Sequence, residues 1–251
     1  MARCALSLFI LLAPRLYSAE APVSALSVDA ALLAGIPLTF TAESARALVS
    51  ERASPPASNA SGLLEHTSAL TQLAALVSSA AEVGARESFS AWALLAGLAG
   101  DSATRPGKRF VRVTTPTTAA GFERELIAPL SRALGVAITT PEELTEPVDV
   151  LLLDGHRSYG ALSRALAALA PRITQFIAVP HTEAFGLVSE TVRRGEDASA
   201  AGAARGWPAL EAASGVKAAL FDFIASGSTR EWALSAHFPN GGGLTILRRV
   251  G

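Results

Sequence analysis

Hydrophobic and polar residues follow two different periods from residue 63 to the end of the chain. Apolar residues recur at helical spacing over 63–77, whereas the continuous apolar run over 148–153 is typical of a strand buried on both faces. Similar patterns continue along the chain and predict strands that alternate with helices. The predicted strands cover 80–83, 109–113, 136–139, 148–153, 173–179, 232–238 and 244–250, and the predicted helices cover 63–77, 88–98, 122–134, 159–170 and 216–225.

This order of elements predicts an α/β fold. Strands that alternate with helices build a parallel sheet with crossover helices. Only the segment 239–243 (PNGGG) separates the last two strands, which indicates an antiparallel hairpin. We therefore expect a Rossmann-like, seven-stranded, mostly parallel sheet with a C-terminal antiparallel hairpin and helices on both faces. Such sheets bind ligands beyond the carboxyl ends of their strands, so the candidate site residues are those that follow each strand.

The chain before residue 63 has a different character. Residues 1–19 carry an early arginine, an apolar stretch and small residues at their end, which is typical of a signal peptide. A transit peptide and an ordinary buried helix are the alternatives. We expect 20–62 to be an N-terminal appendage and Pro/Ser-rich linker, containing the N-glycosylation acceptor triplet at Asn59, and 63–251 to form the main domain. These features predict the secretory pathway or the extracellular space, with organelle targeting as the alternative.

Composition limits the classes of partner. The net charge is −1 and charged residues make up 17% of the chain, which excludes the basic footprint of a nucleic-acid-binding domain. No apolar run reaches the roughly 18–20 residues that span a bilayer, so we expect no integral membrane span. The single cysteine, Cys4, lies inside the predicted signal peptide, so the mature chain has no thiol for a disulfide or a zinc site. The expected partner is a small-molecule substrate, and the sequence leaves the oligomeric state open.

The turn after the first predicted strand is a candidate binding site. Glu82, Gly84 and Ala85 form a strand–glycine–helix turn with an acid two residues before the glycine. Glycine allows a ligand to approach the backbone, and a helix start offers free N–H groups. An ordinary turn between a strand and a helix is the alternative interpretation.

Two further strand ends carry ionisable side chains. Asp154 follows the clearest strand, where a carboxylate is costly unless it binds a cation or accepts hydrogen bonds. His181 follows the next strand, and an imidazole there could act as a base near neutral pH or as a metal ligand. A helix cap for Asp154 and an exposed loop position for His181 are the alternatives. The signatures of serine hydrolases, P-loop NTPases, common NAD dehydrogenases and zincins are absent from the sequence.

Four segments in order resemble one known family. The segments 81–99, 148–166, 173–186 and 215–249 resemble the first motif, the fourth strand with its acid, the fifth strand with its loop, and the closing helix and hairpin of class I S-adenosylmethionine-dependent methyltransferases. The similarity is to the group related to cephalosporin-hydroxylase-like and rhamnosyl O-methyltransferase proteins. It implies the fold predicted above, S-adenosylmethionine as cofactor, and O-methyl transfer to a small molecule or sugar.

The resemblance also implies roles for individual residues. In this interpretation Glu82, Gly84 and Ala85 border the methionine part of the cofactor, Glu142 or Glu143 lies near its adenine, Asp154 lies near the transferred methyl group, and His181 accepts the proton. Asp154 and His181 are also the candidate ligands of a divalent cation.

Two departures from the family pattern leave an alternative open. The segment 111–118 (VRVTTPTT) has no acid where family members carry one for the cofactor ribose, and His181 stands where the family usually has a metal-binding aspartate. The alternative is therefore a catalytically degenerate binding protein with the methyltransferase fold. A different Rossmann enzyme, such as one acting on nucleotide sugars, is a third interpretation.

Overall fold

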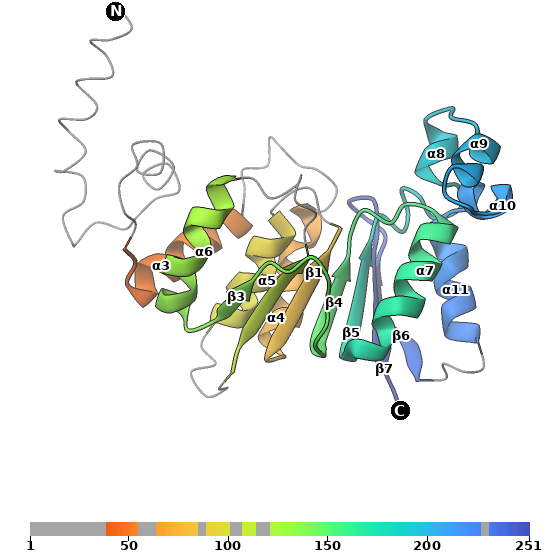
Figure 1. The fold of residues 1–251 in the computed structure, drawn as a ribbon. Helices are drawn as coiled ribbons and strands as arrows, with labels where there is room; N and C mark the ends of the chain where they lie inside the picture. Colours follow the sequence, from red (N-terminus) through yellow and green to blue (C-terminus); the bar gives the residue numbers. More distant parts are fainter. Residues whose placement is uncertain (1–38, 55–63, 85–88, 101–106, 114–120, 227–230) are drawn as a thin grey trace, which may run out of the picture.

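The computed structural model describes residues 39–54, 64–84, 89–100, 107–113, 121–226 and 231–251. Within them a seven-stranded sheet has the order β3-β2-β1-β4-β5-β7-β6 (Figure 1). The predicted signal peptide, the glycosylation triplet and Ala85 lie outside the described residues. The strands are β1 (Ser79–Val83), β2 (Arg109–Val113), β3 (Ala137–Thr139), β4 (Val148–Leu153), β5 (Ile173–Pro180), β6 (Trp232–Phe238) and β7 (Leu244–Arg249).

Strand direction confirms the predicted fold. Strands β1 to β5 pair in parallel, and β7 pairs antiparallel with both β5 and β6. The strand order reverses between β1 and β4: β2 and β3 follow on one side of this pair, and β5, β7 and β6 follow on the other. In open α/β sheets such a switch point marks the place where ligands bind. The C-terminal ends of β1, β4, β5 and β6 all lie at the same edge of the sheet, which we call the rim.

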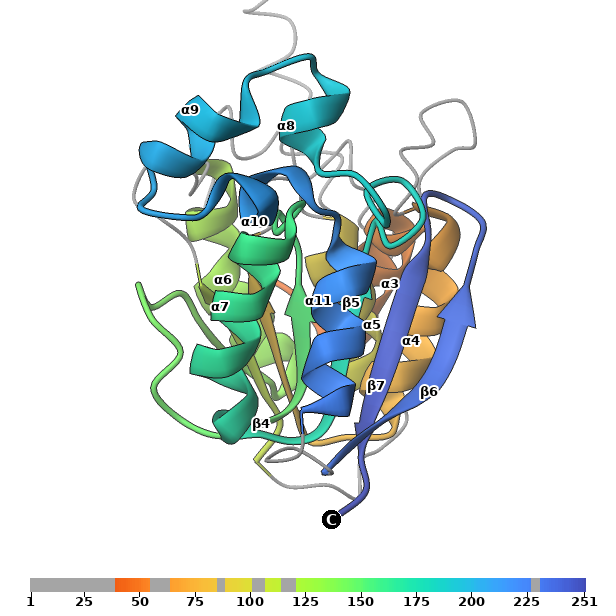
Figure 2. The ribbon, with the colours of Figure 1, turned by 90° about the vertical axis from the view of Figure 1, so that its right-hand side faces the viewer.

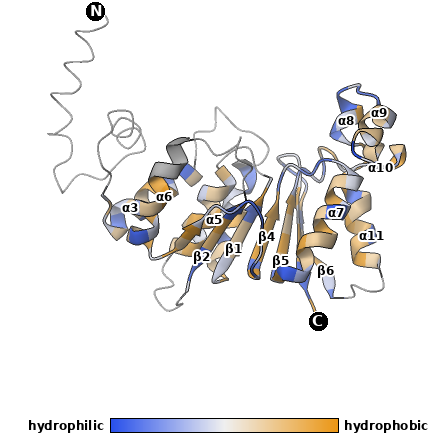
Figure 3. Cartoon of the chain, viewed as in Figure 1, coloured by the Kyte–Doolittle hydropathy of each residue, from blue (hydrophilic) through white to orange (hydrophobic). Residues whose placement is uncertain are grey.

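Helices cover both faces of the sheet, as the apolar periodicities predict. One face packs against a core that includes residues of helices α3 to α6, and the other against a core that includes residues of α7 and α11 (Figures 1 and 3). Alternate residues along a strand point to opposite cores: Phe110 and Leu152 point to the first, and Leu151 and Leu153 to the second. These helices are α3 (Ala42–Ala53), α4 (Thr67–Ala75), preceded by the 3₁₀ turn η2 (Leu64–His66), α5 (Phe89–Ala99), α6 (Gly121–Leu134), α7 (Tyr159–Leu169), followed by the 3₁₀ turn η3 (Ala170–Arg172), and α11 (Val216–Ala225).

Helix α3 belongs to the core, although it precedes residue 63, where we expected the main domain to begin. A capping box joins Thr41 and Ser44 at its start, and its inward face places Ala45, Leu48 and Val49 in the first core. The side chains of these three core residues are fully buried. The segment 20–62, predicted as an appendage and linker, therefore includes a helix that belongs to the core of the domain.

The connection from β3 to β4 is short and has no helix. It crosses from the rim back to the start of β4 over residues 140–147, with Leu144 buried in the second core. At the far end, Glu146 forms an ion pair with Arg109 at the start of β2. Helices α7 and α11 therefore cover the β4–β5 half of this face.

Three short helices lie beyond the rim, between β5 and α11. They are α8 (Glu190–Arg193), α9 (Ala198–Ala203) and α10 (Ala209–Ala213), and we call them the cap. Figure 2 shows the cap above the ends of α7 and α11. The helices predicted from the sequence included none of these three. No helix in the described part of the chain is long and apolar enough to cross a membrane.

Candidate functional site

Gly84 and Gly155 bring the ends of β1 and β4 into backbone contact at the switch point. Gly84 has a φ of 84°, and a Cβ atom there would lie 2.1 Å from the backbone oxygen of Asp154. Gly155 has a φ of 79°, and its Cβ would lie 2.6 Å from the backbone oxygen of Gly84. Any side chain at either position would clash with backbone, so both turns require glycine. The sequence marked Gly84 as part of a candidate binding turn, and the close backbone approach explains why this position requires glycine.

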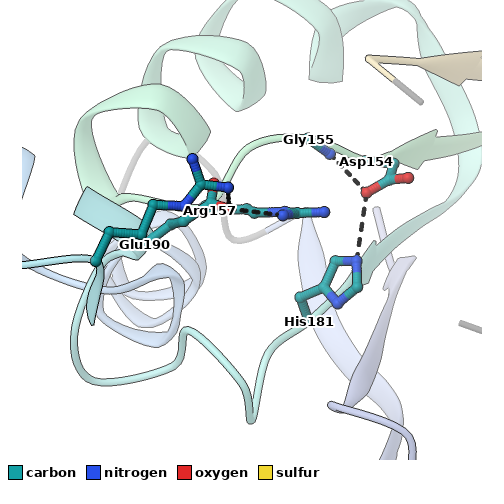
Figure 4. Close-up of polar contacts among 6 residues, drawn as sticks. Asp154, Gly155, Arg157, His181 and Glu190 are labelled. Atoms are coloured by element: carbon teal, nitrogen blue, oxygen red, sulfur yellow. Dashed lines mark hydrogen bonds and ion pairs between the residues drawn. The ribbon is translucent and has the colours of Figure 1, made fainter. Parts of the chain in front are cut away.

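Asp154 and His181 meet at this edge. The Asp154 carboxylate accepts a hydrogen bond of 2.6 Å from the backbone N–H of Gly155, and its Oδ1 lies 3.6 Å from Nε2 of His181 (Figure 4). The Asp154 side chain is 10% exposed and that of His181 is 18% exposed. At this separation the interaction is electrostatic and exceeds the length of a good hydrogen bond. The structure thus brings together Gly84, Asp154 and His181, the three residues on which the sequence interpretation depends.

His181 adopts a backbone conformation that is unusual for its residue type. Its φ of 61° is positive, and it is the only non-glycine residue with a positive φ in the described part of the chain. A left-handed backbone costs an L-residue roughly 1–2 kcal/mol. Residues held in such conformations cluster at functional sites, where the surrounding structure compensates for the strain.

The turn between β6 and β7 holds the loop that carries His181. The backbone N–H groups of Glu183 and Ala184 both donate to the carbonyl of Gly242 at 2.8 Å, and Phe185 donates to the carbonyl of His181 at 2.9 Å. Gly243 allows this close approach, because a Cβ there would lie 2.4 Å from the Glu183 nitrogen. The glycines of the hairpin, which the sequence assigned to a plain turn, therefore fix the loop of the candidate base.

A chain of polar side chains supports the same loop. Glu183 Oε1 accepts from Lys217 at 2.6 Å and lies 2.8 Å from His237 Nε2, whose Nδ1 lies 2.9 Å from the Thr245 hydroxyl. The Thr245 hydroxyl in turn donates to the buried hydroxyl of Thr182 at 3.0 Å. The hydrogen bond from Lys217 is the main reason that the pKa of Glu183 is lowered, and His237 contributes in the same direction. Glu183 is thus committed to positioning the loop.

His156 also belongs to the site. Its Nδ1 lies 3.0 Å from the backbone oxygen of Asp154, and its Cε1 would lie 3.3 Å from a Cβ on Gly84. Burial lowers the pKa of His156, and its contacts with Asp154 oppose this shift only in part. The imidazole therefore lies neutral across the switch point at pH 7. Its position two residues after Asp154 was the only signal in the sequence.

His66 approaches the site from the start of α4. It is fully buried, and burial lowers its pKa against the opposing effect of a hydrogen bond to the Asn240 backbone. The Asn240 side chain donates to Glu65 at 2.8 Å, so the start of this helix is tied to the hairpin turn. The burial of His66 is consistent with a structural role.

Glu82 is buried inside the domain. Its side chain is fully buried and forms an ion pair of 3.1 Å with Nε of Arg112, which is 7% exposed and lies opposite it in the register of β1 and β2. The Ser90 hydroxyl of α5 also donates to this carboxylate. These contacts join β1, β2 and α5 beneath the rim. The cofactor contact implied for Glu82 stays a prediction.

The two candidate residues for the adenine lie apart from the others. Glu142 and Glu143 are exposed on the connection that leaves β3. Two strands separate β3 from β4 in the sheet, which places β3 about 14 Å from the Asp154 strand at ordinary strand spacing. Their assigned role stays a prediction.

The residues at this site do not form a set of ligands suited to a divalent cation. Within the described residues no group of three or more His, Cys, Asp or Glu side chains gathers as metal ligands would. Hard cations prefer several oxygen ligands, and Asp154 and His181 alone provide too few.

The arrangement is suited to moving a proton next to a bound organic molecule. Asp154 orients and electrostatically supports the His181 ring, and a carboxylate in this position stabilises the imidazolium that forms when histidine takes up a proton. The same carboxylate favours a positively charged ligand. The rim of the sheet thus combines a candidate base with a carboxylate that suits a positively charged organic ligand.

Comparison with known proteins adds fold-level likeness at low identity. No family model matches the chain, and no curated protein matches it. Among solved structures, an SAH-bound methyltransferase from Podospora anserina has a TM-score of 0.49 at 14% identity, covering 75% of this chain and 79% of that one. The O-methyltransferase TomG from Streptomyces achromogenes, in complex with SAM, has a TM-score of 0.49 at 15% identity, covering 90% and 96%. An O-methyltransferase from Bacillus cereus in complex with SAH has a TM-score of 0.48 at 13% identity, covering 88% and 96%.

Proposed function

We propose that this protein transfers a methyl group from S-adenosylmethionine to a hydroxyl oxygen of a small molecule. The observation that carries the proposal is the Asp154–His181 pair beside the β1–β4 switch point, with His181 held at a positive φ. The sequence resemblance and the strand order support the same class of chemistry.

The residues at the rim fit the cofactor in charge and in backbone shape. The Asp154 carboxylate suits the sulfonium and ammonium charges of S-adenosylmethionine, and Gly84 leaves the β1 turn without a side chain. When bound, this cofactor supplies a methyl group that is electrophilic because it is attached to a positively charged sulfur.

The protein's part in the reaction is orientation and proton removal. The His181 imidazole would take up the proton of the acceptor hydroxyl, and bound S-adenosylmethionine would supply the methyl group that replaces that proton on oxygen. Asp154 stabilises the resulting imidazolium. A positioned general base contributes roughly 10²–10⁴-fold to a rate, and alignment of the reacting atoms contributes further.

Calorimetric titration with S-adenosylmethionine tests the proposal. We expect saturable binding to the full chain in the micromolar range and weaker binding to Asp154→Asn. We expect His181→Ala to bind the cofactor normally but to lose about 10²–10⁴-fold of methyl transfer to any accepted hydroxyl compound. Both variants should unfold at the same temperature as the wild type within a few degrees.

One observation favours the alternative, a binding protein with this fold and no catalysis. Glu82 is committed to Arg112, and the sequence from Val111 to Thr118 offers no carboxylate for a ribose. Absence of S-adenosylmethionine binding to well-folded protein would support this alternative and contradict the proposed function.

A further inference from the structure

Two arginine side chains contact an aromatic ring that lies next to the candidate base. Phe185 follows His181 in the same loop, and the two rings meet edge-on with their centroids 6.0 Å apart. The guanidinium carbon of Arg157 lies 5.3 Å from the Phe185 centroid, and that of Arg193 lies 5.8 Å from it. These distances are typical of cation–π contacts. The loop after β4 and helix α8 of the cap therefore each bring one cation to the Phe185 ring.

One carboxylate offsets this charge only in part. Glu190 Oε1 accepts from Arg157 at 2.8 Å and from Arg194 at 2.7 Å, so a single acid serves two guanidinium groups. Three arginines and one glutamate leave two formal positive charges, and counting the exposed Glu196 still leaves one.

Other acids of the cap are engaged elsewhere. Asp197 accepts from the Ser199 backbone at the start of α9, and Glu211 pairs with Arg164 at 2.7 Å. Figure 3 shows that α8 is largely hydrophilic, unlike the strands below it. Residues 190–213 carry four acids and three arginines, so the excess of positive charge is confined to the Arg157, Arg193 and Arg194 cluster around Glu190.

Arg157 retains hydrogen-bonding capacity. Within the described residues only its Nη1 has a hydrogen-bond acceptor, the carboxylate of Glu190, and its buried Nε has none. A guanidinium carries five N–H donors in a planar fork that matches carboxylate and phosphate oxygens. Figure 4 shows the Arg157 and Glu190 side chains beside the Asp154–His181 pair.

We propose that the methyl acceptor is an anion: a small molecule with a carboxylate or phosphate group at one end and the reacting hydroxyl at the other. Arg157 and Arg193 bind the anionic group, and this places the hydroxyl at His181, about one ring's length away. This inference rests on the proposed function and specifies its substrate class. The anionic group is unchanged by the reaction: the hydroxyl proton passes to His181, and the methyl group takes its place on oxygen.

Matched probes that differ in one charge test the inference. Ligand-observed NMR would measure the binding of 4-hydroxybenzoate, 4-hydroxyphenyl phosphate and the neutral 4-hydroxybenzamide to the full chain. S-adenosylmethionine binding would be measured in parallel by calorimetry. Because hydrogen bonds to charged groups contribute about 1.5–3 kcal/mol, at least one anionic probe should bind about tenfold more tightly than the amide.

Variants show whether the named arginines cause the preference. Arg157→Gln and Arg193→Gln should each reduce the preference for the anion, and the double variant should abolish it. Arg205→Gln is the matched control, because Arg205 lies 5.5 Å from the Trp207 ring in the same cap but makes no contact with Phe185 among the cation–π pairs of the described residues. The exposed Arg193 can be replaced with little risk to folding.

The outcomes separate the two proposals. Equal binding of anionic and neutral probes, no anion binding at about 10 mM, or a preference that survives the double variant would overturn the inference while cofactor binding persists. Loss of cofactor binding in folded wild-type protein would instead overturn the proposed function, and with it the role of the anion as methyl acceptor.

Discussion

Two acid–base pairs at the same end of the sheet differ in what surrounds them. Glu82 and Arg112 are joined at 3.1 Å on β1 and β2, and both side chains are buried. Asp154 and His181 are 3.6 Å apart on the loops after β4 and β5, partly exposed, and one of them has a positive φ. The first pair satisfies its charges inside the protein, whereas the second keeps a titratable group at the surface where a ligand can reach it. The sequence marked Glu82, Asp154 and His181 alike as candidate site residues, and burial separates the role of Glu82 from those of the other two.

Breaking the buried pair should have the largest effect. Glu82→Ala leaves the Arg112 guanidinium buried without its carboxylate, which should cost about 3–5 kcal/mol of unfolding free energy. The double variant Glu82→Leu/Arg112→Met removes both charges and should recover most of that loss. Urea unfolding measures both, with the exposed Glu142→Gln as the control that should change little. A single variant as stable as the wild type would contradict the structural role of the pair.

The Asp154–His181 pair should respond in the opposite way. Asp154→Asn should weaken S-adenosylmethionine binding by about tenfold or more, because an ionised carboxylate contributes roughly 1.5–3 kcal/mol to a charged contact. Its unfolding free energy should change by less than about 1 kcal/mol, since the amide can still accept from Gly155. Calorimetry and urea unfolding on the same samples check both. The folded double variant Glu82→Leu/Arg112→Met should keep more affinity for the cofactor than Asp154→Asn does. The opposite order would contradict the different roles assigned to the two pairs.

The backbone of His181 gives a smaller, stability-based test. Glycine accepts a φ of 61° without strain, so His181→Gly should be about 1 kcal/mol more stable than His181→Ala. Both variants should lack the proton acceptor and transfer methyl groups equally poorly. Thermal or urea unfolding measures the difference, and an alanine variant as stable as the glycine variant would show that the backbone at this position is not strained.

The pH dependence should be the smallest effect. Burial lowers the pKa values of His156 and His66 below the ordinary 6.5, so the unfolded chain takes up protons first as the pH falls. Stability should therefore be fully present above about pH 6.5 and decrease as the pH falls through the folded pKa values. Glu183, with a pKa lowered from 4.5, acts in the same direction only at more acid pH.

Urea unfolding between pH 7.5 and pH 5 would check this dependence. His156→Gln should flatten the decrease, and Arg205→Gln, which does not titrate in this range, should follow the wild type. An unchanged slope in His156→Gln would contradict the buried, neutral state of this imidazole.

The sequence was most informative where periodicity and burial act together. The apolar run of β4 and the bounds of β2 and α11 were predicted correctly, because a strand buried on both faces and a helix with one apolar face leave clear patterns. Helix α3 was missed as part of the core because its apolar residues are few and precede a Pro-rich stretch. Local signals could not show that this helix packs against α5 and α6.

The location of the site could be predicted from the sequence, but the contacts between its side chains could not. Strand ends identified Gly84, Asp154 and His181, since parallel strands bring their carboxyl ends to one edge. The partner of Glu82 could not be read from the sequence, because Arg112 meets it only through the register of β1 and β2. The places of His156 and Phe185 likewise depend on loop conformations that glycines at positive φ and hydrogen bonds to the hairpin establish.

Hydrogen–deuterium exchange with and without S-adenosylmethionine tests the location of the site most directly. We predict that saturating cofactor slows amide exchange at the switch point, in the segments 153–158 and 181–186, and leaves the far ends of the strands unchanged. Protection that appears elsewhere, or none at all in folded protein at saturating cofactor, would contradict a cofactor site formed around Gly84, Asp154 and His181.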